Sequence, residues 1–155
     1  MKSEKQTILV SNRKASFEYY FLGSYEAGLQ LTGTEIKSVR SGEANLGDAF
    51  CIFIDGELFV KNMHISPYKE GTYSNHEPKR ERKLLLNKSE LKKLQARIKE
   101  KGITIVPLKI YLNENSYAKL EIALAKGKKT YDKRESLKQK DDKREMDRSM
   151  KKNAR

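Results

Sequence analysis

Two short apolar runs joined by the dipeptide Asp55-Gly56 constrain the fold of this chain more than any other feature. The first run extends from Ala49 to Ile54 and the second from Glu57 to Met63. Both runs are rich in β-branched, aromatic and other apolar side chains, and Asp-Gly between such runs is the strongest short-range signal for a two-residue hairpin turn. The sequence therefore predicts an antiparallel β-sheet.

Four further segments have the composition of short strands. Residues 103–112 and 117–125 form a second candidate pair across a polar turn, and residues 19–22 and 29–31 add two more. Pro107 cannot donate a ladder hydrogen bond, so we expect its strand to lie at an edge or to carry a bulge there. About six short strands result.

Capping signals predict two helices. Thr32 and Glu35 have the spacing of a capping box, which favours a helix over about 33–41 that stops at Gly42. Asn87 and Glu90 have the same spacing and predict a second helix over about 88–101. Its apolar stripe comprises Leu91, Leu94 and Ile98.

Short antiparallel strands with two or three short helices indicate a mostly β fold. We expect a small closed or partly closed antiparallel barrel of the oligonucleotide-binding type, which suits this length and charge. The strand pattern leaves a β-sandwich open as the alternative.

Positive charge is concentrated at the C-terminal end of the chain. The 155 residues carry a net charge of +12, and residues 126–155 account for +7 of it. That segment has few sizeable apolar residues, so it cannot bury enough surface to offset the entropy of ordering. We expect a folded domain over 1–125 and a basic tail over 126–155 that is disordered when free.

The chain carries no recognisable catalytic or metal-binding pattern. Cys51 lies in an apolar run and is expected to be buried and inert. His64 and His76 have no metal-ligand spacing with each other or with a cysteine, and no phosphate-binding loop is present. We expect no catalytic residue, no metal and no cofactor. No apolar run is long enough to span a membrane, so we expect a cytoplasmic protein without a membrane partner.

Three basic runs stand beside aromatic or apolar stretches, as in many RNA-binding proteins. They are residues 12–14 before Phe17, residues 79–83 before a leucine triplet, and residues 126–134 around Tyr131. Lys and Arg supply phosphate contacts, and aromatic rings stack on unpaired bases. Each run taken alone could be an ordinary solvated part of the surface. Three such runs in a protein with a net charge of +12 favour an RNA-binding function over that alternative.

Several blocks of the sequence resemble the SsrA-binding protein family, also called small protein B. The resemblance extends from about Asn12 to Arg134 in consistent order and spacing. It is carried by residues 12–15, 26–38, 44–48, 65–68, 82–86, 107–111 and 125–129.

The resemblance implies a barrel that binds transfer-messenger RNA, a rescue RNA that is part tRNA and part message and lacks an anticodon arm. The body would hold the tRNA-like end and stand in for the missing arm. The tail would enter the empty message channel of a stalled ribosome at the small-subunit decoding site. We expect the free protein to be a monomer.

The resemblance also assigns roles to individual residues. Glu26, Leu85 and Lys119 fall where the family contacts its RNA, and the basic runs add further candidate RNA-binding residues: Asn12, Arg13, Lys14, Arg82 and Lys83. Candidates for the decoding site and message channel are Lys126, Lys128, Lys129, Tyr131, Asp132, Lys133 and Arg134. A purely structural role stays open for two of these residues: Leu85 could belong to the core, and Glu26 could merely balance a nearby positive charge.

Two other functions remain open alongside the rescue adaptor. One is a general barrel protein that binds single strands or rRNA without a dedicated RNA. The other is a nuclease or RNA-modifying enzyme. The identity of the bound RNA distinguishes a general RNA-binding protein from the rescue adaptor. Incubation of RNA with the pure protein tests for an enzyme, since a docking protein leaves the RNA intact.

Overall fold

The computed structural model describes residues 7–70, 75–129, 134 and 138 of the chain. In these ranges it contains three helices and nine strands. In chain order they are β1 (Thr7–Ser11), α1 (Ala15–Glu18), β2 (Tyr19–Leu29), α2 (Gly33–Arg40), β3 (Ala44–Asn45), β4 (Phe50–Ile54), β5 (Glu57–Lys61), β6 (His64–Ile65), β7 (Arg82–Leu85), α3 (Lys88–Arg97), β8 (Ile103–Leu112) and β9 (Ala118–Gly127).

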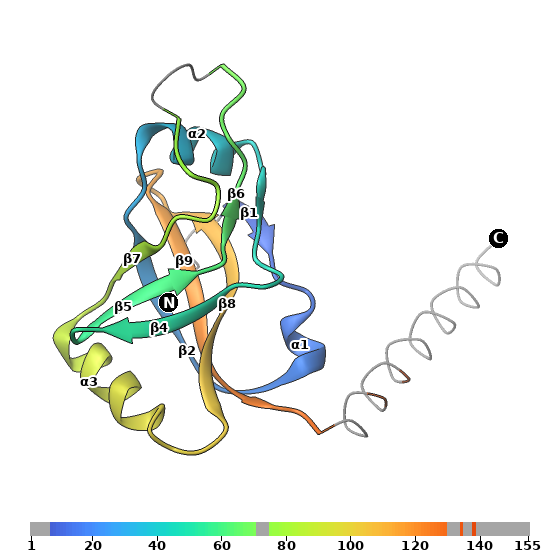
Figure 1. The fold of residues 1–155 in the computed structure, drawn as a ribbon, viewed down its shortest axis with the longest axis vertical. Coiled ribbons are helices and arrows are strands. Elements are labelled where there is room, and N and C mark those ends of the chain that lie inside the picture. Colours follow the sequence, from blue (N-terminus) through green and yellow to red (C-terminus); the bar gives the residue numbers. More distant parts are fainter. Residues whose placement is uncertain (1–6, 71–74, 130–133, 135–137, 139–155) are drawn as a thin grey trace.

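Six antiparallel strands close into a ring (Figure 1). The main sheet has the order β1-β8-β4-β5-β7-β2-β9, and its last strand also pairs with β8. β1 is added outside the ring through β8, and β3 and β6 form a separate two-stranded sheet. The expectation of a mostly β fold with a closed antiparallel sheet is confirmed, and a sheet that closes on itself is not a sandwich.

The predicted hairpin joins β4 to β5. Ile54 pairs with Glu57, and Asp55 and Gly56 both have positive φ angles, of 51° and 78°. Positive φ at both turn residues matches the twist of the flanking strands. The Asp-Gly dipeptide is therefore used as the sequence predicted.

β2 is one long strand, which corrects the prediction of two short ones at 19–22 and 29–31. Gly23, Ser24 and Gly28 have weak strand propensity, yet β2 pairs with β9 from Tyr19 to Gly28. The pairing skips one residue between Phe21 and Gly23, as a bulge does. Pairing with β9 therefore overrides local propensity.

The bulge expected at Pro107 is present in β8. Its pairing with β9 shifts register between Pro107 and Lys109. The Asn12 side-chain amide donates to the Pro107 carbonyl oxygen at 2.8 Å, and the Asn12 backbone N–H donates to the Leu108 carbonyl at 2.7 Å. These bonds satisfy backbone oxygens at the irregularity and fix the end of β1.

The helix boundaries agree with the sequence in α2 and differ in α3. Thr32 and Glu35 form the complete capping box of α2, and Gly42 follows at a φ of 74°. α3 ends at Arg97, four residues earlier than predicted, and the Asn87 side chain makes no cap hydrogen bond. The short α1 was not predicted.

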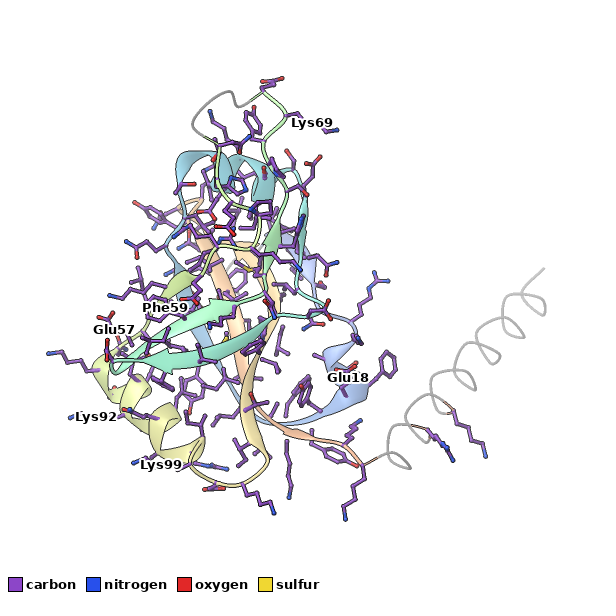
Figure 2. All side chains as sticks on the ribbon, viewed as in Figure 1. Glu18, Glu57, Phe59, Lys69, Lys92 and Lys99 are labelled. Atoms are coloured by element: carbon purple, nitrogen blue, oxygen red, sulfur yellow. The ribbon has the colours of Figure 1, made fainter. Side chains whose placement is uncertain are left out.

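α3 packs on the ring through the predicted stripe. Leu94 is buried, and Leu91 and Ile98 pack against the main core. On the opposite side, the exposed Lys92 of α3 and Lys99, which follows the end of the helix, point away from the ring (Figure 2). The helix thus covers apolar surface with one face and adds positive charge with the other.

The main core lies inside the ring and beneath α2 and α3. It includes Leu58, Val60, Ile105, Leu120 and Ile122, all essentially inaccessible to solvent. Cys51 is buried among them, and burial raises the pKa of its thiol far above the ordinary value. The expectation of a buried cysteine is confirmed, and a raised pKa disfavours the reactive thiolate.

The ordered body extends beyond the predicted boundary at residue 125. β9 continues to Gly127, and the Lys128 N–H donates to the Glu18 carbonyl oxygen at 2.8 Å. The expectation of a disordered tail concerns residues that mostly lie outside the described ranges. In those ranges, no helix is long and apolar enough to cross a membrane.

Candidate RNA-binding surface

Alternation along β7 decides which side chains of its basic run reach the surface. Arg82 and Leu84 point into the core, whereas Lys83 and Leu85 point outward. Leu85 is 52% exposed, although it is a large apolar residue. Its exposure rules out the alternative that Leu85 belongs to the core.

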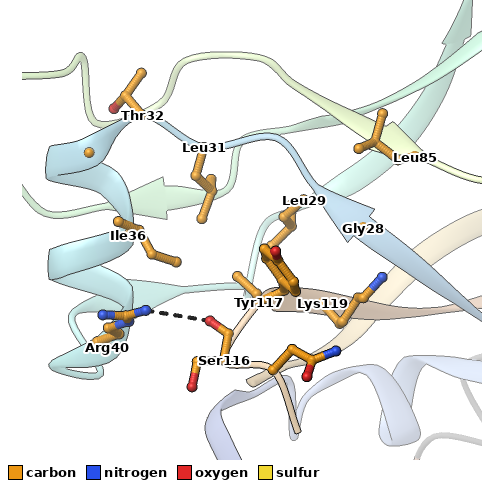
Figure 3. A pocket seen from close by; sticks show the side chains of 13 residues that line it. Gly28, Leu29, Leu31, Thr32, Ile36, Arg40, Leu85, Ser116, Tyr117 and Lys119 are labelled. Atoms are coloured by element: carbon orange, nitrogen blue, oxygen red, sulfur yellow. Dashed lines mark hydrogen bonds between the residues drawn. The ribbon is translucent and has the colours of Figure 1, made fainter. Parts of the chain in front are cut away.

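Gly28 of β2 lies between two of the predicted RNA contacts. It pairs with Leu85 of β7 on one side and with Lys119 of β9 on the other. Figure 3 shows Leu85 on one side of β2 and Lys119 on the other. Glu26 precedes Gly28 by two residues and therefore faces the same side of the sheet. The fold thus brings Glu26, Leu85 and Lys119 together from three adjacent strands.

Leu85 and Lys119 line a hollow of about 460 Å³ on the outer surface. Its wall also includes the first residues of α2, the end of that helix at Arg40, and the turn that leads into β9. Arg40 donates to the Ser116 carbonyl oxygen at 3.4 Å, which ties the helix to that turn (Figure 3). Two cations and several apolar side chains therefore surround one opening.

Sequence reasoning missed two residues of this hollow. Tyr117 is 66% exposed beside Lys119, and Arg40 approaches from α2. Tyr117 was assigned to a strand, and Arg40 to the last turn of a helix. Neither position reveals a distant partner, because Tyr117 precedes β9 and Arg40 is the last residue of α2.

Glu26 is exposed and forms no ion pair with any described residue. The residue opposite Glu26 on β9 is Glu121, whose carboxylate forms an ion pair with Lys109 at 3.2 Å. The charge of Glu121 is thus balanced inside the protein, while Glu26 keeps a free acceptor at the surface. The alternative that Glu26 only balances a neighbouring cation has no support in this geometry.

Arg82 is a correction to the predicted contacts, because its side chain is 0% exposed. Its Nε donates to Glu35, and its Nη1 donates to the Met63 carbonyl oxygen at 2.6 Å. Arg80 donates to the other Glu35 oxygen at 2.7 Å. A guanidinium enclosed in this way cannot reach a phosphate, and it holds α2 against β7 instead.

The pKa of Glu35 reflects this enclosure. Burial alone would raise it, but hydrogen bonds from Arg80, from the Thr32 backbone and from Arg82 outweigh burial and lower the pKa to about 2. Burial acts in the direction that lowers the pKa of Arg82, while its bond to Glu35 opposes that effect. The pair is charged and structural at neutral pH.

Lys83 stays at the surface beside Glu57. Their charged atoms are 2.8 Å apart, and both side chains are partly exposed. An exposed pair of this kind is weak and can exchange for a phosphate partner. Lys83 therefore remains available to RNA, unlike its neighbour Arg82.

The N-terminal basic run lies around a different hollow, of about 410 Å³, which shares no lining residue with the first. Asn12 is used in the scaffold at Pro107. Arg13 and Lys14 are exposed, and Lys14 forms an i,i+4 pair with Glu18 at 3.5 Å. The structure does not bring this run together with Glu26, Leu85 and Lys119.

The start of the basic tail lies beside β2. Lys128 donates to the Ser16 carbonyl oxygen at 3.1 Å and lies 4.8 Å from the centre of the Tyr20 ring. Lys126 and Lys129 are exposed, as is Arg134. Tyr131, Asp132 and Lys133 lie outside the described residues.

No metal centre is formed by the histidines or by other side chains among the described residues. His76 is hydrogen-bonded to the Thr34 hydroxyl and to the Ile65 carbonyl oxygen, both at 2.9 Å. No group of three His, Cys, Asp or Glu side chains in the described ranges could hold an ion.

The comparisons with known proteins agree on one family. The family described as "SmpB protein" matches residues 9–152. An SsrA-binding protein of Phocaeicola vulgatus is 60% identical over 144 residues, which are 93% of this chain and 96% of that protein. One of Bacteroides thetaiotaomicron is 54% identical over 148 residues, or 96% of this chain and 99% of that protein.

A solved structure gives the same result. It is described as "tmRNA-SmpB: a journey to the center of the bacterial ribosome", and one of its chains matches with a TM-score of 0.68 and 48% identity. The match covers 82% of this chain and 92% of that one. From sequence and fold together, this chain belongs to the SmpB family of SsrA-binding proteins.

Proposed function

We propose that this protein binds transfer-messenger RNA and positions it on stalled ribosomes for trans-translation. The observation that carries the proposal is the convergence of Glu26, Leu85 and Lys119 on one exposed face of the ring. The relatives named SsrA-binding protein and the solved structure of SmpB with transfer-messenger RNA support the same partner.

Each residue of the convergent face would make a different kind of contact. Lys119 neutralises a phosphate, and Leu85 packs on an exposed base or sugar. Glu26 accepts a hydrogen bond from a base amine or a ribose hydroxyl. Arg13, Lys14 and Lys83 are exposed or partly exposed, and they are candidates for further phosphate contacts.

A separate part of the proposal concerns the ribosome. Lys128 lies beside the end of α1, where its N–H donates to the Glu18 carbonyl oxygen, and residues 126–155 carry a net charge of +7. So polar a segment needs a polyanionic surface in order to become ordered, and rRNA around the decoding site provides one. We infer that the body substitutes for the missing anticodon arm while the tail probes the empty message channel.

The protein acts by docking, as a cytoplasmic monomer, and catalyses no reaction in this proposal. Its folded part offers an acceptor (Glu26), an apolar side chain (Leu85) and a cation (Lys119) on one exposed face, and these groups can hold RNA without changing it. Incubation of the pure protein with transfer-messenger RNA tests this point. The RNA should remain intact, and cleaved or modified RNA would contradict it.

Recovery of bound RNA is the direct test of the partner. The tagged full-length protein is captured from cells, and the attached RNA is sequenced. We expect transfer-messenger RNA to dominate over tRNA and rRNA fragments relative to their abundance. A broad mixture without that enrichment would favour a general single-strand or rRNA-binding protein.

A truncation after Lys133 tests the role of the tail. It removes 22 of the 30 tail residues, with +4 of the tail's net charge of +7, and leaves Lys126, Lys128 and Lys129 in place. We expect affinity for free transfer-messenger RNA to change little, while tagging of stalled chains in a reconstituted reaction collapses. Full tagging activity in the truncated protein would refute the tail mechanism.

A further inference from the structure

The helix α3 and the turn after it carry a large part of the positive charge of the folded body. Residues 88–101 hold six cations against two carboxylates, a net charge of +4. Residues 7–129 together hold 21 cations against 14 carboxylates, a net charge of +7. The carboxylates of the segment are Glu90, which is half-buried, and Glu100, which pairs with Arg97 at 3.3 Å. More than half of the net charge therefore lies on one short segment.

The protein does not neutralise the lysines of this segment. They are exposed, and none of them forms an ion pair with a described residue: Lys88, Lys92, Lys93, Lys99 and Lys101. On the strands, by contrast, Lys61, Lys83 and Lys109 each pair with a carboxylate. The fold thus balances cations on the ring and leaves those of α3 available to an outside partner.

The placement of these cations does not favour the stability of the helix. Lys88 is the first residue of α3, where the helix dipole disfavours a positive charge. Lys92 follows Lys88 by four residues, and Arg97 follows Lys93 by four, so the helix carries two like-charge pairs that destabilise it. Packing of Leu94 in the core offsets this cost. A bound polyanion would remove the repulsion.

Three of the lysines follow one line along the segment. Lys88 and Lys92 are one turn apart, ~6 Å along the helix axis and ~40° around it. The helical turn continues past the end of α3, because the Ile98 N–H donates to the Leu94 carbonyl oxygen at 3.0 Å, and Lys99 returns to the same side. Figure 2 shows Lys92 and Lys99 pointing away from the ring. We call these three residues the lysine face of α3.

The composition of the lysine face suits the backbone of structured RNA. Residues 86–102 contain no aromatic side chain on which an unpaired base could stack. Lysines neutralise phosphates without reading a base sequence. Double-stranded RNA is recognised mainly by its shape and backbone, whereas recognition of single strands relies on stacking. The ligand that fits is therefore the phosphate backbone of an RNA helix.

The position of α3 indicates which RNA it meets. Figure 1 shows α2 and α3 at opposite ends of the ring, and the hollow that contains Lys119 borders α2. At the α3 end, β8 begins at Ile103, which pairs with Lys126 of β9. Lys126 is the first residue of the basic tail, so the lysine face lies at the end of the ring from which the tail would reach the ribosome.

We propose that the lysine face of α3 binds phosphates of a double-helical segment of ribosomal RNA, while transfer-messenger RNA occupies the face of Glu26, Leu85 and Lys119. This contact is separate from that of the tail at the decoding site, because it uses residues of the folded body. It rests on the proposed function, which supplies the ribosome as the partner.

Neutralisation of the lysine face tests the contact. The test variant replaces its three lysines by glutamine in the full-length protein, since glutamine has about the helix propensity of lysine. Lys92→Gln alone is a milder version. The control variant removes three exposed charges from α2 and the loop beside it, with Lys37→Gln, Lys69→Gln and Lys79→Gln. Circular dichroism and thermal unfolding check that each variant is folded.

Ribosome binding is measured at several salt concentrations. Complexes of each protein with transfer-messenger RNA are pelleted with ribosomes stalled on a truncated message. In the test variant, the slope of log affinity against log salt should become shallower by about 2–3, because three phosphate contacts are lost, and in Lys92→Gln by about 0.7–0.9. The control variant should keep the wild-type slope, and every variant should bind free transfer-messenger RNA as wild type does.

A tethered cleavage reagent identifies the RNA beside α3. Cys51 is the only cysteine in the sequence and is buried, so Lys92→Cys offers one accessible thiol for an iron chelate that generates hydroxyl radicals. On stalled ribosomes we expect cleavage in both strands of a ribosomal RNA helix. Cleavage confined to transfer-messenger RNA, or absent from RNA, would overturn the contact.

Failure of this contact is distinguishable from failure of the proposed function. If wild type shows no preference for transfer-messenger RNA over tRNA, the proposed function fails. If that preference holds but the folded test variant keeps the wild-type salt slope on ribosomes, the α3 contact is overturned. An equal change in the control variant would also overturn it, since net charge alone would then account for the loss.

Discussion

Glu26 and Glu35 lie close together in the sequence, and the fold gives their carboxylates opposite surroundings. Glu35 is fully buried and receives hydrogen bonds from Arg80, Arg82 and its own helix cap. Glu26 is exposed on β2 without an ion-pair partner among the described residues. One carboxylate is fully used by the protein, and the other keeps its acceptor capacity for a ligand.

Two neighbouring basic side chains divide in the same way. Arg82 and Lys83 are neighbours in β7, yet the first is buried and the second lies at the surface. The period of two along a strand makes this division, and the sign of the charge plays no part in it. A basic run in a sequence therefore gives only the number of cations. The alternation of the strand determines which of them are exposed and can contact RNA.

Removal of the buried carboxylate should have the largest effect. Glu35→Ala leaves the Arg82 guanidinium buried without its partner, so we expect a loss of ~3–5 kcal/mol in the free energy of unfolding. Urea denaturation at neutral pH measures it. Glu26→Ala is the matched control and should stay within ~0.5 kcal/mol of wild type. Equal losses in the two variants would erase the distinction between the carboxylates.

The pH dependence of stability should report Glu35 separately. Its pKa is about 2 in the folded protein against an ordinary value of 4.5. Since the folded value is the lower one, the stabilisation is complete above about pH 4.5 and is lost as the pH falls toward 2. The difference corresponds to roughly 3 kcal/mol.

Unfolding free energies between pH 6 and pH 3 measure this contribution. Other carboxylates titrate in the same range, so the comparison is between the slope for wild type and the slope for Glu35→Gln. The variant should show a shallower fall in that window. Identical slopes would mean that Glu35 is not held ionised by its arginine partners.

Loss of the exposed carboxylate should affect binding instead of stability. Glu26→Ala removes a negative charge, so a purely electrostatic interaction with RNA would become equal or tighter. A specific acceptor would be lost, however, and we expect weaker binding by roughly 1–3 kcal/mol. A filter-binding assay at fixed salt gives the sign, and tighter binding would rule out the specific contact.

Much of the fold was predictable because local signals and tertiary context agree. Asp55-Gly56 fixed a hairpin, Thr32 and Glu35 capped α2, and Pro107 marked a bulge. β2 was divided wrongly, because its glycines are weak strand formers that only the pairing with β9 keeps extended. β7 was missed because four residues with two cations do not display an apolar pattern.

The candidate site was predictable only in part. The family resemblance pointed to Glu26, Leu85 and Lys119, and the fold places them around Gly28. The burial of Arg82 was not predicted, because β7 was not recognised as a strand and the partner Glu35 is distant in sequence and lies on a helix. Tyr117 was hidden within a strand assignment although its ring faces solvent. Long-range pairing thus determines both the errors and the omissions.

The smallest effect is expected at Lys83, beside the buried Arg82. Lys83 and Glu57 form an exposed pair at 2.8 Å, and such pairs contribute ~0–1 kcal/mol to stability. The free energy of unfolding of Lys83→Ala should therefore lie within ~1 kcal/mol of the wild-type value. Arg82→Ala should lose several times more. If Lys83 exchanges Glu57 for a phosphate when RNA binds, the slope of log affinity against log salt should be shallower in Lys83→Ala than in wild type, by about 0.7–0.9. Affinities measured at several salt concentrations give that slope. An unchanged slope would assign Lys83 to the surface pair alone, and a loss of stability as large as that of Arg82→Ala would contradict the alternation that separates the two faces of β7.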